Sequence, residues 1–151
     1  MSPRLLRRRP LAVLPIIAVS LVTAAGCGGS DDADFVDGYN SAVQPLSTLM
    51  QDVQPADASD PKSAADSLNK MADGLESVHT KLSDLDAPED AQDELDRLLT
   101  SLEKGTAQVR DMAAAAENGN LEKLSSATQD FSKTGTDLVT AEQQLRTAVE
   151  G

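Results

Sequence analysis

The chain has 151 residues, the length of a single domain, and its 25 acidic and 13 basic residues give it a formal net charge of −12. This charge argues against nucleic acid as a partner, because the phosphate backbone would repel it. One Cys and one His exclude an internal disulfide and any site built from several Cys or His ligands.

The first 26 residues have the layout of an export signal. Arg4 and Arg7–Arg9 precede an almost wholly apolar stretch, residues 11–25, and no acid occurs before Asp31. Such a stretch is too short to cross about 30 Å of hydrocarbon comfortably, but it matches the central part of a secretory signal peptide. We therefore expect residues 1–26 to be removed, with an uncleaved membrane anchor as the alternative. The arginines suit both the general secretory and the twin-arginine route.

The end of this stretch, Thr23-Ala24-Ala25-Gly26-Cys27, resembles the lipobox of bacterial lipoproteins, in which small residues precede an obligatory Cys. Ala24 stands where that family usually has Leu. The resemblance covers the signal region alone. It implies that Cys27 carries diacylglycerol on its thiol, becomes the mature N-terminus and holds the protein on the extracytoplasmic face of the cell membrane. Two acyl chains, at about 0.8 kcal/mol per buried CH₂, give a stable anchor.

The exported body is strongly acidic. Export removes four of the 13 bases and none of the 25 acids, so nine bases face 25 acids and the net charge becomes −16. Anionic lipid headgroups repel such a body within a screening distance of about 8 Å. We expect residues 27–33 to form a lipidated tether and residues 34–151 to form a domain that stays near the membrane without lying on it.

Apolar residues recur at helical spacing in four segments of this body. In the second segment they alternate steps of four and three, as one face of a helix requires: Ala64, Leu68, Met71, Leu75, Val78, Leu82 and Leu85. The other segments are less regular: Phe35, Tyr39, Val43, Leu46, Leu49 or Met50 and Val53; then Ala91, Leu95, Leu98, Leu102, Val109 and Met112; then Leu121, Leu124, Phe131, Leu138, Leu145 and Val149. Composition alone favours disorder, because Leu, Ile, Val and Phe make up only about 18% of the body. The periodicity favours four helices.

Helix signals fall between these segments. Asp34, Asp60 before Pro61, and Asp86 with Glu89 three residues later are candidate N-caps, while the Asn118-Gly119-Asn120 run can end one helix and cap the next. Short connections favour antiparallel neighbours. The sequence therefore predicts an all-α fold, an antiparallel up-down-up-down four-helix bundle, in which Pro45 kinks a shorter first helix.

Glycines at one level of this bundle are candidates for a small pocket or a hinge. Gly105 and Gly135 lie at similar distances from the Gly119 turn, with Thr106 and Thr134 beside them, and Gly74 lies near the same level. A glycine inside a helix costs up to about 1 kcal/mol. The structural alternative is that these glycines allow close helix approach or leave room for the rings of Tyr39 and Phe131.

Metal sites have weaker support. Glu76 and His79 form a Glu-x-x-His step, but a di-iron site needs a second such motif and the chain has no other His. A haem or a single metal ion on His79, with Met50, Met71 or Met112 as the second haem ligand, is a minor alternative. An acidic cluster that could hold cations also suits helix starts by matching the helix dipole: Asp84, Asp86, Glu89, Asp90, Asp93 and Glu94. We expect weak divalent-cation binding only and no bound cofactor.

Two functions follow from this reading. The first is a lipid-anchored extracytoplasmic helical bundle that acts as an interaction or structural module, with an envelope protein as its partner. The second is a small-ligand or metal carrier that uses the bundle interior or the acidic helix ends. We do not expect an enzyme, because no nucleophile is placed to pair with the lone His and no phosphate-binding loop occurs.

Overall fold

The structure, a computed structural model, describes residues 30–52 and 60–150. This part of the chain forms four α-helices, α1 (Ser30–Asp52), α2 (Pro61–Ser83), α3 (Gln92–Glu117) and α4 (Leu121–Glu150), with a short 3₁₀ helix, η1 (Glu89–Ala91), before α3. It contains no strand within the described ranges, so the predicted all-α class is confirmed. At 1.5 Å per residue, α3 and α4 are about 39 and 45 Å long.

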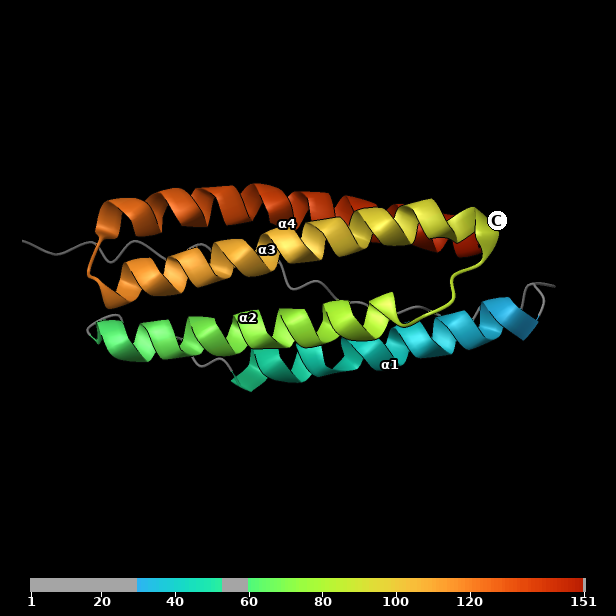
Figure 1. Cartoon of the computed structure of the whole chain (residues 1–151), viewed down its shortest axis with the longest axis horizontal. Coiled ribbons are helices and arrows are strands. Elements are labelled where there is room, and N and C mark those ends of the chain that lie inside the picture. Colours follow the sequence, from blue (N-terminus) through green and yellow to red (C-terminus); the bar gives the residue numbers. More distant parts are fainter. Residues whose placement is uncertain (1–29, 53–59, 151) are drawn as a thin grey trace, which may run out of the picture.

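The helices pack on one another in sequence order. α2 and α3, and α3 and α4, contact each other extensively, and α1 lies on α2 (Figure 1). Their facing side chains form one apolar core, to which all four helices contribute: Phe35, Tyr39 and Ala42 from α1; Ala72, Leu75, Val78 and Leu82 from α2; Leu95, Leu98, Leu102 and Val109 from α3; and Ala141 and Leu145 from α4. Burial of this core supplies the main driving force for folding.

The predicted apolar face of α2 is confirmed, with one shift. Leu75, Val78 and Leu82 are buried as expected. Ala65 and Ala72 are also buried, and neither belongs to the predicted set. Alanine is small enough to let a neighbouring helix approach closely, so the centre of the buried face lies slightly to one side of the leucine stripe.

The N-terminus of α2 is capped as predicted. The Asp60 side chain accepts a hydrogen bond from the Lys62 backbone N–H at 3.1 Å, and Pro61 occupies the first helical position, where its missing N–H costs nothing. The expected cap at Asp86 is wrong. Residues 89–91 form η1 instead, and α3 follows from Gln92 without a side-chain cap.

The turn between α3 and α4 also follows the prediction. Gly119 has a positive φ of 65°, a conformation that glycine adopts without steric cost. The Lys123 backbone N–H then donates to the Asn120 side chain at 3.0 Å, which satisfies one of the free amides at the start of α4. Leu121, at the end of the bundle beside this turn, is 76% exposed although it belongs to the predicted stripe.

α1 begins at Ser30, four residues before the expected cap, so Asp34 lies inside the helix. The helix continues through Pro45, which cannot donate a hydrogen bond to the Ser41 carbonyl. A Cβ at Gly38 would lie 2.7 Å from the Leu85 side chain, so this glycine lets α1 approach the end of α2 closely.

Candidate functional site

The predicted lipidation site, Cys27, lies outside the described residues. α1 begins three residues after it, at Ser30. Residues 30–33, which were predicted to belong to the tether, therefore lie in α1. Within the described residues, none of the four helices is both long and apolar enough to span a bilayer.

The structure brings some of the predicted mid-bundle residues together. Gly105 and Thr106 are buried on α3, and Thr134 is fully buried on α4. A Cβ at Gly105 would lie 3.7 Å from both the Phe131 ring and the Thr134 methyl group, which is ordinary van der Waals contact. This glycine therefore faces the Phe131 ring and is not required by an unusually close helix approach.

The other two glycines of the predicted set are Gly135, next to Thr134 on α4, and Gly74 on α2. A Cβ at Gly135 would have no atom within 4 Å, so this residue faces open space beside the buried Thr134. Gly74 is half-buried on α2. The pocket or hinge therefore remains a prediction, in which Gly105 of α3 faces Thr134 of α4.

Thr134 is chemically unusual among the described helical threonines. Thr106, Thr128 and Thr140 each donate a hydrogen bond to the backbone carbonyl four residues earlier, at 2.9, 2.7 and 2.9 Å. The Thr134 hydroxyl is buried without a hydrogen-bond partner in the described part of the chain, as is the side-chain oxygen of Gln108 on α3. An unsatisfied buried hydroxyl costs free energy, because it has lost its bonds to water.

The residues named as metal or haem ligands, Glu76, His79 and the methionines, are not grouped into a metal site in the described part of the chain. The Glu76 carboxylate is paired across the α2–α3 interface with Arg110, which also lies 3.8 Å from Asp73. His79 is half-buried on α2. Across residues 30–52 and 60–150, no three His, Cys, Asp or Glu side chains are grouped to hold a metal ion. Of the methionines named as haem ligands, Met71 packs beside the core, and the side chain of Met50 is not among those that the structure describes.

An open groove of about 520 Å³ lies along the seam between α3 and α4, a feature that the sequence did not predict. Eight of its nine lining residues are of polar type, although much of the surface they present is from their apolar atoms: Asp96, Arg97, Thr100, Ser101 and Lys104 from α3, and Asp137, Thr140, Ala141 and Gln144 from α4. Two acids and two bases cancel in this lining, whereas the whole chain carries a formal net charge of −12. The groove is therefore close to neutral on an acidic protein.

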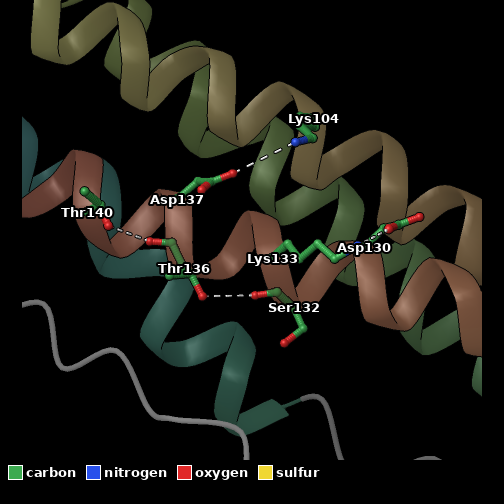
Figure 2. A network of polar contacts seen from close by, with 7 residues as sticks. All are labelled: Lys104, Asp130, Ser132, Lys133, Thr136, Asp137 and Thr140. Carbon is green, nitrogen blue, oxygen red and sulfur yellow. Dashed lines mark hydrogen bonds and ion pairs between the residues drawn. The ribbon is translucent and has the colours of Figure 1, made fainter.

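Polar contacts line part of this groove and continue along α4. Figure 2 shows Lys104 of α3 reaching toward Asp137 of α4 across the groove, with 3.9 Å between the Nζ and Oδ2 atoms. The Thr140 hydroxyl donates to the Thr136 carbonyl at 2.9 Å, and the Thr136 hydroxyl donates to the Ser132 carbonyl at 3.3 Å. Because both hydroxyl protons are used inside the helix, these groups offer mainly acceptor lone pairs outward.

A second, much smaller crevice joins the start of α1 to the end of α4. We call its lining residues the α1–α4 seam: Phe35, Val36 and Tyr39 from α1, and Glu142, Leu145, Arg146 and Val149 from α4. Burial raises the pKa of Tyr39, and the nearby Glu142 carboxylate raises it further. Burial also raises the pKa of Glu142, an effect that Arg146 partly offsets. The seam therefore buries an acid among apolar side chains.

Comparison with known proteins adds no family and no relative. The chain matches no protein-family model, and the searches of curated proteins and of solved structures return no similar protein either.

Proposed function

We propose that this protein is a non-catalytic, lipid-anchored helical bundle on the extracytoplasmic face of the cell membrane, where it acts through contact with other envelope components. The observation that carries the proposal is Cys27, which follows a basic and then apolar leader and precedes a Gly-Gly-Ser run. The early start of α1, at Ser30, supports it by placing the folded body directly after the attachment point.

The proposal includes the antiparallel up-down-up-down arrangement of the helices. The Gly119 turn supports it, because three residues between α3 and α4 leave no length for a return crossing. The order of contacts, α1 on α2, α2 on α3 and α3 on α4, also supports it. In such a rod, one end lies near the tether and the far end projects from the membrane.

Metabolic labelling tests the anchor. Cells that express the full chain and receive a labelled fatty acid should incorporate the label, and the protein should sediment with membranes. Cys27→Ser should abolish both results, whereas Ser30→Ala, a substitution of similar size three residues away, should change neither. An unlabelled protein whose Cys27→Ser variant still sediments with membranes contradicts the proposal.

Co-purification tests the mode of action. Chemical cross-linking in intact cells, followed by purification from detergent extracts, should return a specific envelope protein with the native chain. The Lys104→Ala and Asp137→Ala variants should return less of it if the α3–α4 groove contributes to contact. Cross-linked material identical to that from an unrelated anchored protein of similar charge would argue against a specific partner.

A carrier of a small ligand is the second candidate, and one observation favours it. The α3–α4 groove is an open depression of about 520 Å³ that presents both acidic and basic side chains to a polar ligand. A melting temperature that rises in the presence of one ligand class and not others would support this candidate. A melting temperature that stays flat across divalent cations and polar small molecules would oppose it.

A further inference from the structure

α1 is held less extensively than the other helices. Within the described part of the chain, the α2–α3 and α3–α4 contacts are each much larger than the α1–α2 contact, and the backbones of α1 and α4 have at most a marginal contact. α1 reaches α4 through side chains of the α1–α4 seam. Helices α2, α3 and α4 therefore share most of the packing interface described here.

The seam itself depends on two aromatic side chains. The rings of Phe35 and Tyr39 have centroids 6.4 Å apart and are tilted by 40°. Both residues are nearly fully buried, and Leu145 of α4 is buried with them. The remaining space is only about 10 Å³, too little for more than one water molecule, so the seam is closed.

A charged pair weakens this closed seam. The Glu142 side chain is only 14% exposed, and its Oε1 lies 3.5 Å from Arg146, a long contact for an ion pair. Removing a carboxylate from water costs free energy that one such contact does not fully restore. The α1–α4 seam therefore combines the favourable burial of apolar side chains with the desolvation cost of Glu142.

α1 is also a weak helix by its own sequence. Gly38 lowers its helical stability by about 1 kcal/mol relative to Ala, and a proline inside a helix costs about 3 kcal/mol. A Cβ at Gly38 would crowd the terminal methyl group of Leu85, so an alanine there would displace that side chain. Once released from its neighbours, α1 has little reason to remain helical.

We propose that α1 is a separable strap, which opens from α2, α3 and α4 as one unit while those three helices stay folded together. Opening exposes the apolar side chains of the α1–α4 seam on both sides. Proteins commonly open in contiguous units whose opening free energies lie below that of global unfolding. The core formed by α2 and α3, with Val78, Leu82 and Val109 fully buried, supplies the stability of the part that stays closed.

The strap also affects how far the protein can extend from the membrane, a consequence that rests on the proposed lipid anchor. α1 lies between Cys27 and the other helices, so an open strap would let these three helices move away from the membrane surface. The exchange experiment below does not depend on lipid. Failure of the strap would therefore be distinct from failure of the anchor, which the labelling experiment measures.

Hydrogen exchange of the full chain in detergent, read by mass spectrometry in increasing urea, tests the strap. Amides of residues 35–46 should be protected at least tenfold less than those of residues 72–82 and 95–109. Their protection should also depend less on urea, because opening one helix exposes less surface than global unfolding.

Two substitutions separate a strap from a single cooperative unit. Tyr39→Ala should speed exchange in α1 by about 100-fold or more, the effect of losing a buried aromatic side chain, and leave α2 and α3 within about threefold of the native chain. Val109→Ala in α3 should instead speed exchange in α2 and α3 by about tenfold or more and leave α1 within about threefold. If each variant accelerates all four helices by one common factor, or if α1 shows the same protection and urea dependence as α2 and α3 in the native chain, the proposal is overturned.

Discussion

Replacing Thr134 by valine should make the protein more stable. Thr134 is 0% exposed, and its hydroxyl has no hydrogen-bond partner in the described part of the chain. Valine has nearly the same shape, the same branching at Cβ and a similar helix propensity, so the Thr134→Val change removes the hydroxyl and little else. The methyl group that faces Gly105 stays in place.

The expected gain follows from the cost of an unmade hydrogen bond. A buried donor or acceptor without a partner costs about 1–3 kcal/mol relative to its hydrated state. Because the unfolded chain hydrates the hydroxyl fully and valine adds apolar burial at the same position, we expect a gain of about 1–2 kcal/mol. For a chain of this size, each kcal/mol corresponds to a rise of about 2–4 °C in melting temperature.

Urea unfolding followed by circular dichroism measures this gain, and Thr106→Val is the matched control. Thr106 is also buried, on α3, but its hydroxyl donates to the Leu102 carbonyl at 2.9 Å. Removing that satisfied bond should be neutral or cost up to about 1 kcal/mol. A loss of stability in Thr134→Val, or equal effects at the two sites, would refute the argument that the missing bond decides the outcome.

Three further substitutions test other parts of the structure. Gly119→Ala should lower the free energy of unfolding by about 1 kcal/mol through its positive φ alone, because no atom lies within 4 Å of the added Cβ; urea unfolding measures it. Leu82→Ala should cost about 2–5 kcal/mol by leaving a cavity at a residue 1% exposed, as thermal unfolding should show. The Glu142→Gln change should raise stability at pH 7 more than at pH 4. Burial raises the folded-state pKa of Glu142 above its ordinary 4.5, so its contribution to stability falls as the pH rises from 4.5 through the folded-state pKa. An equal Glu142→Gln effect at both pH values would contradict this sign.

The helices could be predicted because their signals are local. The stripe in residues 64–85 and the cap at Asp60 depend on spacing and side-chain type within a few turns. The cap expected at Asp86 failed although its residue types were suitable. Three residues of η1 come between it and α3, and nothing in the local pattern distinguishes a 3₁₀ turn from the first turn of an α-helix.

The candidate sites were less predictable because they depend on which helix faces meet. The α3–α4 groove unites Lys104 and Asp137, residues that look like ordinary solvated positions in the sequence. Glu142 likewise lies at a position that the helical pattern of α4 assigns to the surface. Its side chain is mostly buried because Tyr39 of α1 packs near it, which the local pattern does not show. The level of Gly105 and Thr134 was predictable from their distances to the Gly119 turn, but the orphaned hydroxyl was not.

α4 carries both Thr134 in the core and Glu142 in the seam, so stabilising substitutions should be found on this helix and should combine. The two residues are eight positions apart, about 12 Å along the helix, and they share no described partner. Effects at such a distance usually add within about 0.5 kcal/mol. We therefore expect the double variant Thr134→Val with Glu142→Gln to gain the sum of the two single changes in urea unfolding at pH 7. A coupling well above that size would mean that both residues act on one shared feature, the seating of α4 on its neighbours, and not through a missing hydrogen bond at one site and a buried charge at the other.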